Sequence, residues 1–239
     1  VNLTGVDTAK VTNMAAMFNR CHALTSLDVS GFNTGEVTDM NCMFYECLVP
    51  TIYVGNFNTA KVTNMRYMFY NSYKVEELDL SNFDTRAVTD MDNMFGRCFG
   101  LESLNISGFN TANTTSMVNM FDQCTELDTV NLGAQFEFKG NTTLPDDGNT
   151  MWKNPVGYGY TALQIAVAGP AACGAPGEFT RATEFSVGSI IQNGSLTGPT
   201  TVAPATDYDG VIVPNTGYNL PESITLTIGG DEMTADVDY

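Results

Sequence analysis

The chain has 239 residues, enough for one or two domains, and its 10 Lys and Arg against 27 Asp and Glu give a formal net charge of −17. Such a polyanion repels phosphate backbones and anionic lipid surfaces, which argues against binding to nucleic acid or to a membrane surface. The sequence has no apolar run of membrane-spanning length and no signal peptide at its start, so we expect no direct membrane insertion.

One phrase, V-T-x-M-x-x-M-F-x-x-C, recurs five times before residue 135. Each copy keeps both methionines and the phenylalanine, and four of the five end in cysteine. A repeat of this length is typical of a solenoid, whose units cannot bury their apolar faces alone and must stack on their neighbours. Successive phenylalanines are 25 or 26 residues apart (Phe18, Phe44, Phe69, Phe95 and Phe121).

Two further segments complete each unit. After the cysteine, L-x-x-L-x-[LVI] alternates apolar and polar residues and predicts a short strand at residues 24–29, 75–80, 101–106 and 127–132. The second unit is one residue shorter and carries Pro50 at this point. An F-[ND]-T turn follows, whose Asn or Asp can hydrogen-bond backbone groups ahead of it. The V-T-x-M step then predicts a second extended side, and M-F-x-x-C a single helical or 3₁₀ turn.

This pattern resembles the BspA-like subclass of leucine-rich repeats in bacterial surface proteins. Residues 78–85, LDLSNFDT, followed by VTDM at 88–91, match that repeat almost letter for letter. The resemblance covers residues 1–134 and implies an α/β fold: a leucine-rich-repeat-like, right-handed solenoid of five coils, with short parallel strands and single helical turns. It also implies an extracellular location at a bacterial cell surface or cell wall. The family has no common catalytic residues.

The remaining sequence divides into two further regions. Residues 135–177 lose the repeat and are interpreted as a C-terminal cap and a linker, because the last coil of a repeat array has to be covered. Residues 178–239 alternate β-branched residues with turn signals at 193–194, 214–215 and 229–230, which predicts a small β-sandwich-like module. It is similar to short β modules of Gram-positive surface proteins that continue beyond this length, so we expect the chain to be a fragment of a longer surface protein.

The cysteines have two interpretations. Cys21, Cys47, Cys98 and Cys124 share one column of the repeat with Ser72, which favours a ladder of reduced, buried thiols. The alternative is a disulfide between neighbouring coils, Cys21–Cys47 or Cys98–Cys124.

A metal or cofactor site is not predicted. The chain has no C-x-x-C, and its single histidine, His22, has no recurrent Ser, Asp or Cys partner for catalysis. The methionine columns are core rather than soft-metal ligands. Calcium at residues 207–209 and 231–232 is a weaker option, because no D-x-D-x-D-G loop is present.

Aromatic residues supply the candidate partner-binding surface. Amphipathic rings on a rigid repeat array suit contact with a protein or a glycan. Trp152 with Tyr158 and Tyr160 can be read as a sugar platform, although the core of the cap is the simpler interpretation. The predicted patch consists of tyrosines crowded into the second and third units: Tyr45, Tyr67, Tyr70, Tyr73 and Tyr53.

These observations predict a non-enzymatic cell-surface module that binds or adheres to a protein or glycan. The alternative is a structural spacer or assembly subunit of a larger surface protein. A glycan-active protein is a third and weaker option, supported by the aromatic residues alone. Ligand identity and oligomeric state do not follow from the sequence.

Overall fold

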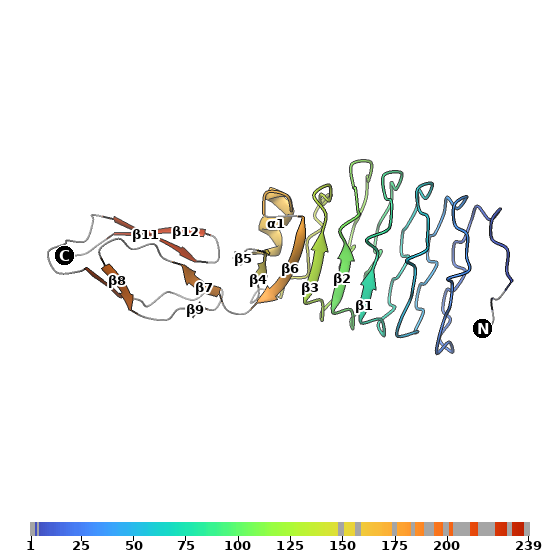
Figure 1. Ribbon diagram of the computed structural model, residues 1–239, viewed down its shortest axis with the longest axis horizontal. Coiled ribbons are helices and arrows are strands. Elements are labelled where there is room, and N and C mark those ends of the chain that lie inside the picture. Colours follow the sequence, from blue (N-terminus) through green and yellow to red (C-terminus); the bar gives the residue numbers. More distant parts are fainter. Residues whose placement is uncertain are drawn as a thin grey trace.

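The computed structural model describes residue 3 and residues 5–147, 151–155, 159–173 and 176–182, and then the backbone of six short strands between 185 and 236. The repeat units lie side by side in chain order (Figure 1). This described part is mostly β. It has an open mixed sheet of strand order β1-β2-β3-β6-β4-β5, two smaller sheets among the strands from residue 185 onward, and a single helix, α1 (Ala162–Ala168). No helix among these residues has the length and apolar character needed to cross a bilayer.

The strand side of the units is regular only in the last three. There, β1 (Glu77–Asp79), β2 (Ser103–Ile106) and β3 (Thr129–Leu132) pair in parallel, as predicted, and their alternate residues point inward. The strand predicted at residues 24–29 is absent. Its neighbour in the second unit is one residue short and contains Pro50, which has no N–H to donate to a ladder.

The helical turn predicted at M-F-x-x-C is wrong. In each unit two i→i+3 hydrogen bonds, such as Met17 N–H to Met14 O and Cys21 N–H to Phe18 O, enclose a residue of positive φ at their third position. These are type II turns. All ten non-glycine residues of positive φ in the described chain occupy these two positions, including Ala16 (58°) and Arg20 (55°). The fold therefore has consecutive tight turns where the α/β prediction placed helix.

The side of each unit that carries these turns, here called the turn side, has a directional hydrogen-bond pattern. At each of the four interfaces between units, four bonds of 2.7–3.0 Å run from an N–H of the earlier unit to a carbonyl of the later unit. A bond in the opposite direction precedes them, such as Thr38 N–H to Thr12 O at 2.8 Å, and completes a parallel β-bridge at the V-T-x-M step. In the third unit, for example, Tyr67, Phe69 and Asn71 donate to Asp92, Met94 and Gly96. A β ladder instead alternates donors and acceptors along each strand edge. The turn sides therefore form a polar stack with its N–H groups directed toward the C-terminal end.

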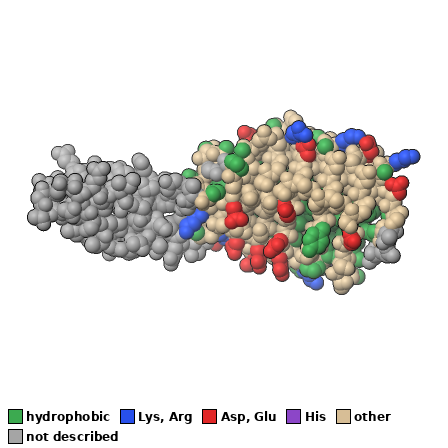
Figure 2. Space-filling model, in the orientation of Figure 1, with side chains coloured by type: hydrophobic (Ala, Val, Ile, Leu, Met, Phe, Trp, Pro, Cys, Tyr) green, Lys and Arg blue, Asp and Glu red, His purple; other side chains and the backbone are tan. Residues whose placement is uncertain are grey.

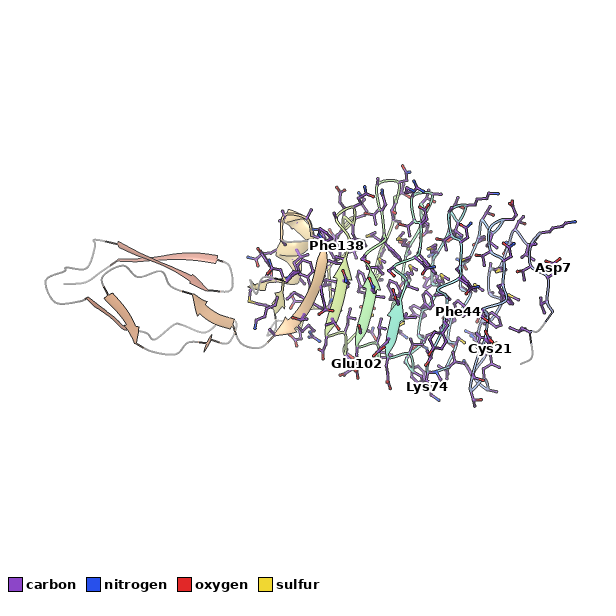
Figure 3. All side chains as sticks on the ribbon, viewed as in Figure 1. Asp7, Cys21, Phe44, Lys74, Glu102 and Phe138 are labelled. Carbon is purple, nitrogen blue, oxygen red and sulfur yellow. The ribbon has the colours of Figure 1, made fainter. Side chains whose placement is uncertain are left out.

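The predicted shared interior of phenyl and thioether groups is confirmed. The rings of Phe18, Phe44, Phe69, Phe95 and Phe121 stack with centroids 5.4–5.9 Å apart, and all are buried. Nine of the ten repeat methionines are buried as well, and Met17 in the first unit is the exception. Figure 3 shows Phe44 inside the stack. At about 1.5–3 kcal/mol per buried side chain, this interior is a large stabilising contribution.

A threonine column supports the F-[ND]-T corner. Each Thr Oγ1 donates to a carbonyl of the next unit at 2.8–3.0 Å and accepts an N–H from it at 2.7–2.8 Å. The sequence did not predict this ladder. The predicted Asn and Asp turns are confirmed, since Asn33, Asn58, Asp84 and Asn110 accept from the N–H two residues ahead. The threonines are buried (Thr8, Thr34, Thr59, Thr85 and Thr111).

All six cysteines are free. Cys98 Sγ donates to Phe69 O and Cys124 Sγ donates to Phe95 O, each at 3.0 Å, and Ser72 Oγ makes the same bond to Phe44 O at 2.6 Å. Each of these residues thus contacts the phenylalanine carbonyl of the preceding unit. This arrangement is the reduced ladder, and neither disulfide considered above is present.

The last unit is covered by a short cap. β6 (Gly177–Ala182) pairs antiparallel with β3 and with β4 (Met151–Lys153), and β4 pairs with β5 (Gly159–Tyr160). A capping box starts α1, in which the Thr161 hydroxyl accepts from Gln164 N–H. The sheet of the stack thus runs to Ala182, beyond the boundary at residue 177 drawn from the sequence.

The described residues beyond 182 are all in strands, here given for their backbone only. β11 (Ser223–Ile228) pairs antiparallel with β12 (Asp231–Asp236) and with β7 (Phe185–Gly188). β9 (Thr201–Val202) also pairs with β7, and β10 (Val211–Pro214) pairs with β8 (Gly194–Thr197).

Candidate functional site

Three of the five predicted tyrosines form one aromatic cluster. Tyr45 and Tyr70, which share a column of the repeat, stack with centroids 5.1 Å apart and an interplanar angle of 22°. Tyr67 lies edge-on to both, 5.3 Å from Tyr70 and 6.2 Å from Tyr45. All three side chains are half-buried on the turn side of the second and third units. The cluster is therefore partly covered and still presents aromatic surface to solvent.

Three arginines lie over these rings. The guanidinium carbon of Arg66 is 4.9 Å from the Tyr67 centroid, that of Arg20 is 5.8 Å from Tyr45, and that of Arg97 is 5.9 Å from Tyr70. Such cation–π contacts hold the cation at a ring face. Three of the five arginines in this acidic chain thus gather at one place. We call the six residues the Tyr–Arg cluster (Tyr45, Tyr67, Tyr70, Arg20, Arg66 and Arg97).

The turn geometry explains how these side chains meet. Tyr67 and Arg97 occupy the positive-φ positions of their turns, so neighbouring units present them in register with the tyrosine column. Gly96 occupies that column in the fourth unit, where a Cβ would lie 3.1 Å from Tyr70 Cδ2. The missing side chain leaves room for the Tyr70 ring to extend over the next unit.

Two residues of the cluster have shifted pKa values, Tyr45 and Arg66. The pKa of Tyr45 is raised, first by desolvation and then by the neighbouring charge of Glu46. The pKa of Arg66 is also raised, first by its hydrogen bond with the Tyr67 hydroxyl, at 3.5 Å. Both shifts favour a neutral Tyr45 phenol and a positive Arg66 guanidinium at neutral pH.

The other two predicted tyrosines lie apart from the cluster, and neither makes a ring contact. Tyr53 is 73% exposed and lines a shallow groove over β1 and β2, together with Glu77 and Asp79. Tyr73 is exposed at the end of the turn in the third unit. Asp and Glu side chains gather toward the lower edge of the face seen in Figure 2. The predicted patch thus divides into a basic aromatic cluster and an isolated Tyr53 on an acidic groove.

The sequence analysis did not identify the arginines as part of the site. The signal was present in the alignment of the units, because Arg20 and Arg97 share the position before the cysteine column and Arg66 directly precedes Tyr67. The crowding of the tyrosines does not by itself reveal the arginines beside them.

The remaining candidates make no competing site. His22 Nε2 lies 3.2 Å from Glu46 Oε2, which also pairs with Arg20 at 3.4 Å. Trp152 is 1% exposed and donates to Pro145 O, so it is part of the cap core and not a sugar platform. No group of three or more possible metal ligands occurs among the described residues. Tyr158 and the calcium candidate at 207–209 lie outside those residues, as do the side chains at 231–232.

Together these features define a repeat protein of stacked β units, closed by a small cap and carrying a basic aromatic cluster on its turn side. The chain belongs to the family described as Mycoplasma protein of unknown function, DUF285, whose model matches residues 1–50 and 49–143. No curated protein and no solved structure shows significant similarity to it.

Proposed function

We propose that this chain is a non-enzymatic binding module of a bacterial cell surface and that the Tyr–Arg cluster contacts its protein or glycan partner. The observation that carries the proposal is the gathering of three tyrosines and three arginines on a rigid stack of otherwise acidic character. Tyr and Arg are the residues most enriched in energetically dominant contacts. The extracellular location and the finer classification as a BspA-like leucine-rich-repeat solenoid are part of the proposal, supported by the repeat pattern.

The rigidity of the stack supports a binding role. Tyr45 and Tyr70 are fixed by backbone that is hydrogen-bonded to the preceding unit, since the Tyr45 carbonyl accepts from Arg20 N–H and the Tyr70 carbonyl from Glu46 N–H. Little conformational entropy is then lost when a partner orders these side chains.

The test is a binding screen against host surface proteins and glycans with matched variants. Tyr67→Ala/Tyr70→Ala removes two of the rings, whereas Tyr53→Ala removes an equally aromatic side chain outside the cluster. We expect the first variant to abolish binding and the second to leave it unchanged, with similar melting temperatures as the control for folding. Binding that is lost only in Tyr53→Ala would move the site to the acidic groove.

An assembly subunit is a second candidate, favoured by the ends of the polar stack. Asn119, Phe121 and Gln123 in the fifth unit have N–H groups with no acceptor among the described residues, and a cavity of about 580 Å³ lies against them. In the first unit, the carbonyls of Asn13 and Ala15 likewise accept no such bond. Light scattering across a concentration series separates this candidate, since an assembly subunit self-associates and a binding module stays monomeric.

A further inference from the structure

We propose that the ligand of the Tyr–Arg cluster is a sugar that bears a carboxylate, such as a uronic acid residue. This inference rests on the proposed binding function and names the chemistry that the site would recognise. It begins from the charges of the cluster.

Arg66 and Arg97 have no carboxylate partner among the described residues, although the chain holds 27 Asp and Glu. The other three arginines are each paired within 3.4 Å, Arg20 with Glu46, Arg86 with Asp84 and Arg181 with Asp147. The Nε atom of Arg66 is buried and makes no hydrogen bond. Neither guanidinium group forms a salt bridge among the described residues, so the terminal nitrogens of both, but not the buried Nε of Arg66, are available to an anionic group.

Asp90 and Asp92 act on the Arg66 cation through their charge without forming a salt bridge to it, and both also accept hydrogen bonds from the turns. Asp90 Oδ1 accepts the N–H of Asp92, and Asp92 Oδ1 accepts the N–H of Val118 at 2.7 Å and the hydroxyl of Ser116. These bonds hold the carboxylates against the turns of the fourth and fifth units. The repulsion between an anionic ligand and the more distant Asp and Glu side chains is weakened at physiological ionic strength, where the Debye length is about 8 Å.

The geometry fits a carboxylate on a small ring. A guanidinium group binds a carboxylate through two parallel N–H···O bonds. The rings of Tyr67 and Tyr70 are 5.3 Å apart and at 84° to each other, with Arg66 over Tyr67 and Arg97 over Tyr70, so cations, half-buried rings and phenol hydroxyls lie together. A sugar presents the matching combination of C–H groups, hydroxyls and, in a uronic acid, one carboxylate. A nucleic acid is disfavoured because its many phosphates meet the acidic remainder of the chain.

The experiment compares oligomers of a uronic acid with the same oligomers after chemical reduction of the carboxyl to a primary alcohol. Isothermal titration with the full chain should show the acidic oligomer binding at least about tenfold more tightly, as expected for a charge-assisted pair. Arg66→Gln/Arg97→Gln should remove that preference, and Arg66→Lys/Arg97→Lys should restore it in part. Arg86→Gln, which changes an exposed arginine outside the cluster, should leave it unchanged.

The outcomes separate this inference from the function on which it rests. Equal affinity for the acidic and reduced oligomers, lost in Tyr67→Ala/Tyr70→Ala, would overturn the carboxylate and leave glycan binding standing. A cluster-dependent protein ligand with no binding of either oligomer would overturn the sugar alone. Tight acidic binding that survives in Arg66→Gln/Arg97→Gln would place the carboxylate elsewhere. No cluster-dependent ligand in any screen would overturn both proposals.

Discussion

The turn side and the strand side of the units hold neighbouring units together in different ways. On the strand side, β1–β3 pair regularly, but the first two units have no strand, and Pro50 with a one-residue deletion is accommodated. On the turn side, all five units keep the same two type II turns and the same four directional bonds per interface. The strand ladder is thus interrupted in the first two units, whereas the turn pattern is kept in all five. The turn side is therefore the part that fixes the spacing of the units and positions the Tyr–Arg cluster.

The largest expected effect is the loss of a ring from the phenylalanine stack. Phe69 lies between Phe44 and Phe95, with centroids at 5.4 and 5.9 Å, so Phe69→Ala should lower the free energy of unfolding by about 3–5 kcal/mol. Ile52→Ala on the irregular strand side should cost only about 2 kcal/mol, because that segment lacks a ladder and can collapse into the space. Urea denaturation measures both. A larger loss in Ile52→Ala would reverse the comparison.

The threonine column gives the next effect. Thr59 is buried and exchanges two hydrogen bonds with Asp84, so Thr59→Val leaves a backbone N–H and a carbonyl unpaired and should cost about 1–3 kcal/mol. Thr63→Val, four residues further along the chain, removes an exposed hydroxyl and should change stability by less than about 0.5 kcal/mol. Equal losses in the two thermal melts would show that burial of the column is unimportant.

The buried thiols of the cysteine ladder should make the free energy of unfolding fall at alkaline pH. Burial raises the pKa of Cys98 from 9.0 to about 12 and raises that of Cys124 as well. Because the thiol pKa is higher in the folded state than in the unfolded state, the full free energy of unfolding is present below pH 9. It falls as the pH rises toward 12. Cys98→Ser/Cys124→Ser should therefore lose less stability between about pH 8 and pH 10.5 than the unmodified chain. Parallel pH profiles for the two proteins would contradict this.

The smallest effect tests the turn geometry through two neighbouring residues. Gln123 has a φ of 58°, which favours glycine, so Gln123→Gly should stabilise the protein by up to about 1 kcal/mol. Asp122 beside it is outside the left-handed region, so Asp122→Gly should destabilise by about 0.5–1 kcal/mol. Opposite signs in thermal melts are the expected result, and the same sign for both would argue against type II turns.

How much the sequence could predict differs between these features. The period placed the five repeat phenylalanines and nine of the ten repeat methionines in the core correctly, because a repeated position has the same surroundings in each inner unit. The same period could not reveal that M-F-x-x-C is a pair of turns, since Ala16, Cys42, Tyr67, Asn93 and Asn119 share a positive φ without sharing a residue type. Glycine would have signalled this conformation. At the site, the tyrosines were found from their crowding, while Arg66 and Arg97 required knowledge of which units adjoin.

Native-state hydrogen exchange tests the central claim, that directional bonds on the turn side hold the units together, most directly. The amides of Phe44, Phe69 and Phe95 donate across interfaces, and the equivalent amide of Phe121 has no described acceptor. We predict that the first three exchange as slowly as strand amides such as that of Leu104, and that Phe121 exchanges much faster. Rapid exchange at all four phenylalanine amides, with protection confined to β1–β3, would contradict the account.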